Sequence, residues 1–180
     1  MKHSTVRYIL FAVIFSLLPC FGTFAQNVPI GIKLGITAAD ATLVSPYDGR
    51  RQPTSSRIST IAGLFLNANI GSGLLFRPGA ELIGKGATEG TGYSYPVILH
   101  YLDFPVNILY KKRHLLWGGG PFVGIPLPKR YEDYDQPTEY GLNAQIGYEL
   151  DIGASFNLNY SYGLSKFHNR YLGIFLGYTF

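Results

Sequence analysis

The chain has 180 residues, of which 47% are hydrophobic and 15% aromatic, and one domain suits this length. Without an amino-terminal signal segment it would carry 13 Lys and Arg against 11 Asp and Glu, which is too near neutral to indicate nucleic-acid binding. No later segment approaches eighteen consecutive apolar residues, and this excludes a helical membrane protein.

The amino terminus has the pattern of a signal peptide. Two basic residues precede an apolar run, Tyr8–Leu18, that is too short to span a bilayer comfortably. Small residues at positions 23 and 25 then provide a cleavage pattern before Gln26. We therefore expect residues 1–25 to be removed and residues 26–180 to form the mature domain.

The only cysteine, Cys20, lies within this predicted signal peptide. The segment Leu17–Cys20 superficially resembles a lipoprotein cleavage site, but Pro19 stands where a small residue is expected. The predicted mature chain therefore has no disulfide, no thiol chemistry and no cysteine metal site.

Eight segments have the alternating pattern of β-strands. They are Ile30–Thr37, Ile58–Asn69, Leu74–Lys85, Tyr95–Tyr110, Leu115–Leu127, Tyr140–Leu150, Gly153–Leu164 and Arg170–Phe180. Short connections alternate with longer or more polar ones, as in an up-and-down barrel. An even number of strands places both termini on the periplasmic side, with the short connections as periplasmic turns.

The two faces of these strands differ in polarity. In the last strand, Leu172, Ile174 and Leu176 share one face, and in the sixth strand Asn143 and Gln145 share the other. Apolar residues on the outside and polar residues inside are typical of a closed barrel in a bilayer. Two rims of aromatic residues follow from this register: Tyr140 and Tyr162 on the extracellular side, and Tyr110, Trp117, Tyr148 and Tyr178 on the periplasmic side. The predicted fold is an all-β, eight-stranded antiparallel transmembrane barrel.

Three segments carry a resemblance to a known family. The run from Tyr101 to Tyr110 resembles the fourth-strand pattern of the PorT-like outer-membrane β-barrel family of Bacteroidetes, with an acid at Asp103 and a proline at Pro105. Gly119–Gly124 resembles its glycine-proline-aromatic fifth strand, and Ile30–Gly35 its opening strand. The resemblance implies an eight-stranded barrel without an assigned activity. The member that names the family is associated with a secretion system, a role that fold alone does not transfer.

Five charged residues are predicted to face the lumen: Lys33, Arg77, Glu81, Asp103 and Glu149. They could form a proton or ion path. The structural alternative, which we favour, is a polar network that fills the barrel, because eight strands enclose barely enough space for side chains. Pro105 removes a ladder hydrogen bond, so we expect a bulge or a local distortion there.

The loops contain charged clusters of modest specificity. Lys166, His168 and Arg170 would meet lipopolysaccharide phosphates through charge-assisted hydrogen bonds, or would form a solvated loop tip. The third loop carries Glu132, Asp133, Asp135 and Glu139, which could bind a cation or a glycan or form a solvated loop, and the spacing of a calcium loop is absent from the sequence. Lys111, Lys112 and Arg113 are expected to form a charged periplasmic turn.

The functional prediction is a non-enzymatic outer-membrane barrel with a role in envelope structure, surface interaction or secretion-system support. The expected partners are outer-membrane lipid, lipopolysaccharide and envelope proteins; no cofactor and no nucleic acid is expected. The alternative is a barrel enzyme that modifies lipid, for which His100 with Ser94 is the only pair close enough in sequence. A soluble ligand-carrying barrel would need the apolar faces to point inward.

Overall fold

The computed structural model describes residues 28–40, 43–44, 51–52, 54–89, 96–127, 138–165 and 169–180. The predicted signal peptide lies outside the described residues. So do Ser94, Lys166, His168 and the third-loop acids at positions 132, 133 and 135.

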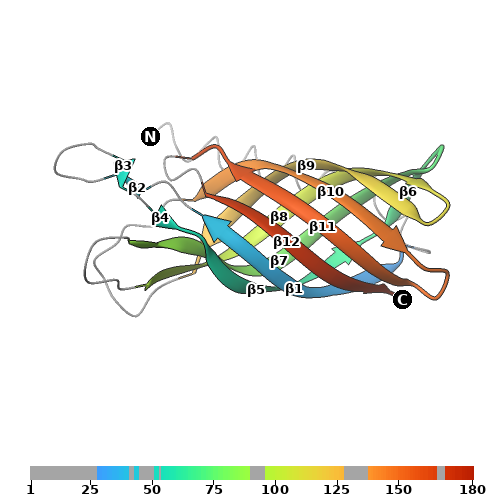
Figure 1. Cartoon of the computed structure of the whole chain (residues 1–180). Coiled ribbons are helices and arrows are strands. Elements are labelled where there is room, and N and C mark those ends of the chain that lie inside the picture. The colour runs from blue at the N-terminus through green and yellow to red at the C-terminus, as the bar shows by residue number, and fades with distance from the viewer. Residues whose placement is uncertain are drawn as a thin grey trace, which may run out of the picture.

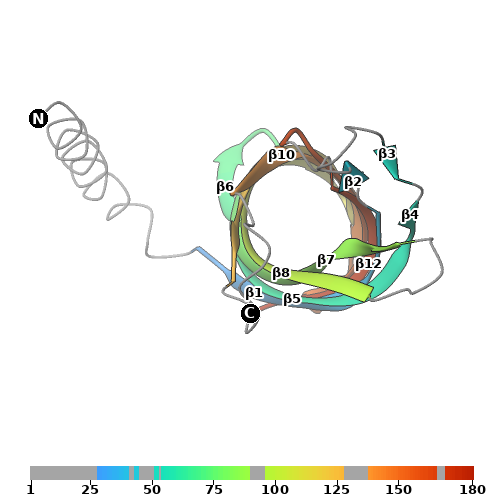
Figure 2. The same ribbon diagram turned by 90° about the vertical axis from the view of Figure 1, so that its left-hand side faces the viewer.

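Eight antiparallel strands form the closed barrel that the sequence predicts. They are β1 (Ile30–Asp40), β5 (Arg57–Leu66) continued by β6 (Ala68–Gly71), β7 (Leu74–Glu89), β8 (Pro96–Lys112), β9 (Leu115–Pro126), β10 (Glu139–Glu149), β11 (Ala154–Gly163) and β12 (Arg170–Thr179). Each strand pairs with its neighbours in the chain, and β12 pairs with β1 to close the ring (Figures 1 and 2). Three two-residue strands, β2 (Leu43–Val44), β3 (Arg51–Gln52) and β4 (Thr54–Ser55), lie in the first long connection.

The two ends of the barrel differ. Tight turns at residues 72–73, 113–114 and 151–153 lie at one end, together with the carboxyl terminus, and we call this the turn end (Figure 1, right). Ser72 and Arg113 take positive φ values of 52° and 56° there, as compact turns between antiparallel strands require. The opposite end carries the long connections, and we call it the loop end. Within the described residues, no helix is long and apolar enough to cross a membrane.

Side-chain direction follows the strand alternation. Along β10 the residues alternate strictly between buried and exposed, so that Asn143 and Gln145 face the lumen while Leu142 and Ile146 are 56% and 49% exposed on the outside. Leu158 and Ile174 on the next two strands are also exposed. The apolar faces therefore surround the barrel, as a lipid-facing wall requires.

The lumen also holds apolar and aromatic side chains. Ile61, Ile83, Tyr101, Tyr171 and Phe175 are at most 5% exposed and form one cluster inside the ring. Eight strands leave an interior that side chains can fill, and these residues occupy part of it.

The wall is interrupted near two prolines. The β7–β8 ladder runs through Pro78↔Val106 and resumes at Glu81↔Asp103, and the β8–β9 ladder breaks just after Pro105↔Phe122. The register is the same before and after both gaps. Pro105 therefore produces the local distortion that was one of the two expected outcomes, without the extra residue of a bulge.

A register shift lies elsewhere, between Asn69 and Gly71 of β6. Just before it, Asn67 separates β5 from β6. Its side chain accepts a hydrogen bond from Arg77 Nε (2.6 Å) and donates one to Thr179 Oγ1 (3.3 Å). The predicted second strand is thus two strands, β5 and β6, and the Asn67 side chain between them connects to β7 and β12.

Candidate functional site

Charged side chains fill the lumen in three groups. Arg77, Glu81 and Lys85 follow one another at intervals of four on the inner face of β7, from the turn end toward the loop end. Each meets partners from other strands. We name the groups the turn-end cluster (Arg77, Lys111, Glu149), the middle pair (Lys33, Glu81) and the loop-end cluster (Lys85, Asp103, Glu139). All five residues predicted to face the lumen belong to these groups.

The loop-end cluster is the most deeply buried. Lys85 Nζ lies 2.6 Å from Asp103 Oδ2 and 2.7 Å from Glu139 Oε2, and all three side chains are at most 3% exposed. The rings of Tyr101 and Phe122 lie with centroids 4.9 and 4.7 Å from the same nitrogen. The desolvated ammonium of Lys85 therefore contacts two carboxylates and two aromatic faces. Removal of any one charged group would leave another buried charge without its partner.

Two members of this cluster are missing from the sequence prediction. The sequence predicts Glu139 in the third loop, and this prediction is wrong: Glu139 is the first residue of β10 and is 1% exposed. The predicted third strand ends at Lys85, without a lumen role for this residue. The alternation of side chains along each strand could have found both residues. Lys85 shares the inner face of β7 with Glu81, and Glu139 shares the inner face of β10 with Asn143.

The middle pair is an ion pair between Lys33 Nζ and Glu81 Oε1 that crosses from β1 to β7. Lys33 Nζ also lies 5.2 Å from the centroid of the Phe175 ring. These contacts place a compensated charge pair between the two clusters.

The turn-end cluster centres on Glu149. Lys111 Nζ lies 2.5 Å from Glu149 Oε1, and Arg77 Nη2 lies 3.6 Å from Glu149 Oε2. Lys111 and Lys112 are the last two residues of β8, so the predicted charged turn is wrong for both, and the Lys111 side chain reaches the mouth of the lumen. Arg77 also lies over the Phe65 ring, 4.6 Å from its centroid.

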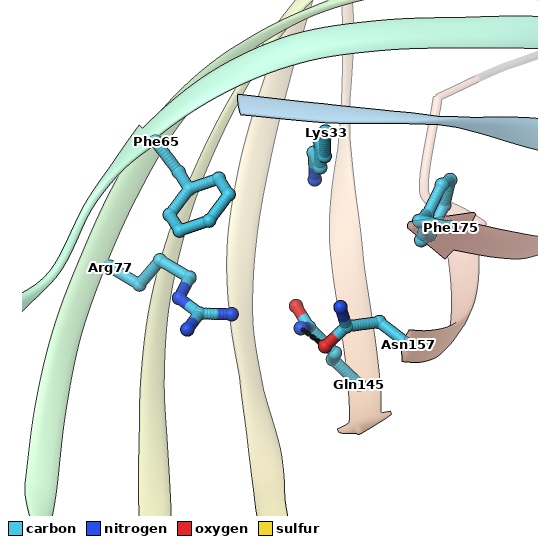
Figure 3. A pocket seen from close by; sticks show the side chains of 6 residues that line it. All are labelled: Lys33, Phe65, Arg77, Gln145, Asn157 and Phe175. Atoms are coloured by element: carbon cyan, nitrogen blue, oxygen red, sulfur yellow. Dashed lines mark hydrogen bonds between the residues drawn. The ribbon is translucent and has the colours of Figure 1, made fainter. Parts of the chain in front are cut away.

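A small cavity lies among side chains from six strands (Figure 3). Its volume is about 10 Å³, close to the space that one water molecule needs. The side chains of Lys33, Phe65, Arg77, Gln145, Asn157 and Phe175 line it. Gln145 Nε2 donates a hydrogen bond of 2.8 Å to Asn157 Oδ1 at its edge. The lumen at this level is filled by side chains that bind one another.

The turn-end rim carries the predicted aromatic residues on its outer face. Tyr110 and Trp117 contact each other edge to face, with centroids 4.9 Å apart, on the hairpin of β8 and β9. Tyr148 on β10 and Tyr178 on β12 are 48% and 43% exposed. Such rings are typical of a membrane interface.

The loop-end rim holds the predicted contact residue Arg170. Its Nη2 lies 2.7 Å from Asp40 Oδ2, so that this exposed pair joins β12 to β1. Lys166 and His168 lie outside the described residues, and the predicted basic cluster stays a prediction.

The described histidines lie at opposite ends of the barrel. His100 is exposed on β8 near the loop end, whereas His114 lies in the turn between β8 and β9, with Nδ1 3.1 Å from the Glu149 carbonyl oxygen. The structure therefore does not bring these two residues together.

Comparison with solved structures shows the same fold. The outer membrane protein Ail of Yersinia pestis, whose backbone structure was determined in a phospholipid bilayer nanodisc, matches with a TM-score of 0.53 and 13% identity over 86% of this chain and 100% of Ail. Neisserial surface protein A (NspA) matches with a TM-score of 0.51 and 12% identity over 85% of this chain and 97% of NspA. At these identities the similarity concerns the fold alone.

Similarity in sequence identifies the family. No curated protein matches this chain. The family model described as "Outer membrane protein beta-barrel domain" matches residues 24–169. The apolar outer wall, the filled lumen and this match agree, and the chain belongs to the outer membrane protein beta-barrel domain family as an integral outer-membrane β-barrel.

Proposed function

We propose that this protein is a non-enzymatic, non-conducting outer-membrane barrel that displays its long loops for envelope structure, surface interaction or secretion-system support. One observation carries the proposal: the lumen charges bind one another at three successive levels. An ion would have to break these pairs in a low-dielectric interior, which is energetically costly.

The PorT-like resemblance supports the proposal of a filled lumen, because residues of its sequence patterns lie in the lumen. Tyr101 and Asp103 belong to the fourth-strand pattern, and Phe122 belongs to the glycine-proline-aromatic strand. All three surround Lys85. We propose that the chain is PorT-like in this internal architecture, and that any role in secretion depends on partners of the loops.

The orientation forms part of the proposal. We place the turn end in the periplasm and the loop end outside the cell, with the mature chain starting at Gln26. Single cysteines test this, since the predicted mature chain has none. A membrane-impermeant maleimide applied to intact cells should label a cysteine at Tyr134 in the third loop but not one at Ile152, which is 70% exposed in a turn. The reverse labelling pattern would contradict the orientation.

Recordings in planar bilayers test the closed lumen. The purified mature protein should show no stable conductance steps. The variant Lys85→Ala with Glu139→Ala removes two side chains of the loop-end cluster and should raise the frequency of current steps. Steady conductance of the unmodified protein would contradict the proposal.

Crosslinking in intact cells tests the display of loops. A photo-reactive residue at Tyr134 or Lys166 should capture an envelope, surface or secretion protein. The control position is Leu158, which faces outward on β11. Capture from Leu158 but from neither loop would contradict the proposal.

The enzyme alternative needs His100 with Ser94, and Ser94 lies outside the described residues, so this pair stays a prediction. Single replacement of His100, His114 and His168 by Ala should leave the lipid A species unchanged by mass spectrometry. A change in that profile with any of the three would favour the enzyme.

A further inference from the structure

The barrel wall has a slit between β5 and β7 in its loop-end half. The ladder joining these strands runs from Phe65↔Gly79 to Ile61↔Ile83 and stops there. Beyond it, residues 57–60 of β5 continue to pair with β1, and residues 84–87 of β7 continue to pair with β8. Pairing of β7 resumes with β4 at Ser55↔Thr88 and Thr54↔Glu89, so the slit is an interruption of four residues on each strand, 57–60 on β5 and 84–87 on β7.

A groove of about 380 Å³ opens on the outer surface at this slit. This volume lies in the range of roughly 300–1,000 Å³ that is usual for ligand sites. The residues around it are Leu34, Gly35, Thr60, Ile61, Ala62, Leu82, Gly84 and His100. Two exposed positions carry small residues (Thr60 and Ala62), Gly84 is buried, and Leu34 and Leu82 beside them are 62% and 48% exposed.

The groove is polar at one end and apolar at the other. Thr60 and His100 lie nearer the loop end of their strands, and Leu34 and Leu82 lie nearer the middle of the barrel. No ladder joins residues 57–60 of β5 to residues 84–87 of β7, and backbone groups without a ladder partner require another polar partner within a membrane. A molecule that fills the groove must therefore combine a polar head at the loop end with an apolar chain toward the middle.

We propose that this groove binds one acylated, phosphate-bearing glycolipid of the outer leaflet, with an acyl chain along Leu34 and Leu82 and its head at Thr60 and His100. The groove lies on the lipid-facing wall and is continuous with the bilayer, so membrane lipid has direct access to it. The imidazole and hydroxyl groups donate hydrogen bonds to phosphate oxygens. The choice of leaflet rests on the proposed orientation of the barrel.

The test uses the full mature chain in detergent, titrated with lipid A, dephosphorylated lipid A or phosphatidylethanolamine, with the bound lipid counted by native mass spectrometry. Ala62→Phe fills the groove with a side chain suited to a lipid-facing wall, and Ala144→Phe makes the same change on β10, also at an exposed position. His100→Ala removes the polar contact. Heat-modifiable migration on a gel establishes that each variant is folded.

The unmodified protein and Ala144→Phe should bind one lipid A in preference to phosphatidylethanolamine. Ala62→Phe should lose this binding for both forms of lipid A. His100→Ala should weaken binding of lipid A by about tenfold to a hundredfold, the effect of one hydrogen bond to a charged group, and leave the dephosphorylated form unchanged.

Equal binding by all variants, a preference for phosphatidylethanolamine, or occupation of the groove by a protein strand would overturn the inference. The conductance and loop-crosslinking results do not depend on the groove, and Ala62→Phe should leave them as they are. Failure of the groove and failure of the proposed function can thus be distinguished.

Discussion

The two halves of the barrel wall are built differently. From β10 to β12 the ladders run without interruption from rim to rim, and inward and outward residues alternate strictly. From β5 to β8 the wall contains an irregular register at β6, gaps next to Pro78 and Pro105, and the slit. We infer that ladder hydrogen bonds stabilise the regular half, whereas the interrupted half depends more on side-chain contacts for its stability.

The buried charges follow this division only in part. Arg77, Lys85 and Asp103 come from β7 and β8, where ladder bonds are missing, but Glu149 and Glu139, which pair with the two cations, come from β10 in the regular half. Gln145 and Asn157 add a neutral hydrogen bond between β10 and β11. The interrupted half should therefore be more sensitive to the loss of a lumen side chain, and four substitutions test this.

The largest effect is expected from Lys85→Met. It leaves Asp103 and Glu139 buried without their counter-charge, which should destabilise the barrel by ~3–5 kcal/mol. Urea unfolding in lipid vesicles, followed by the fluorescence of the single tryptophan, measures this. Adding Asp103→Asn and Glu139→Gln to the same chain should restore much of the stability. If Lys85→Met is as stable as the unmodified protein, the inference that the interrupted half depends on side-chain contacts is wrong.

A charge on the regular wall should have the next largest effect. Leu158→Arg places a guanidinium on the lipid-facing surface of β11 and should cost ~2–4 kcal/mol if this position lies near mid-depth. The comparison variant Thr60→Arg lies near the loop-end rim, where the penalty should fall to ~0–1 kcal/mol. The same unfolding assay measures both, and equal penalties would contradict the assigned depths.

A smaller effect is expected from Asn157→Ala in the lumen of the regular half. Asn157 accepts a hydrogen bond from Gln145 and donates one of 3.0 Å to Ser155 Oγ. Its removal leaves a buried amide without an acceptor, at a penalty of ~1–3 kcal/mol. Asn159→Ala is the matched control, because Asn159 Oδ1 has no partner among the described side chains. If the control is destabilised more, the assigned bonds do not determine stability here.

The smallest effect is expected at the turn-end rim. Trp117→Leu removes the edge-to-face contact with Tyr110 and should destabilise by ~0.5–1.5 kcal/mol beyond the loss of area. Tyr140→Leu at the other rim, with no ring partner among the described residues, is the comparison. Gel migration after stepwise heating measures both variants. A larger loss for Tyr140→Leu would show that the ring contact adds nothing.

Much of the fold could be predicted because its pattern is local. Alternation along Tyr140–Leu150 indicates both the strand and its inner face, and that face is the buried one. The same alternation predicts that five charged side chains face the lumen, and the structure places them there: Lys33, Arg77, Glu81, Asp103 and Glu149. The alternation did not identify Glu139, because this residue follows other acidic residues and the sequence does not show that a strand begins at it.

Period-two alternation in this sequence determined the number of strands, their faces and the closed antiparallel barrel, because each strand needs one face for lipid and one for the lumen. Only the tertiary structure decided which charges meet, and it alone revealed the slit between β5 and β7. The physical reason is that ion pairs and gaps depend on the register between strands far apart in the chain, such as Lys85 with Glu139, and local periodicity does not contain that register.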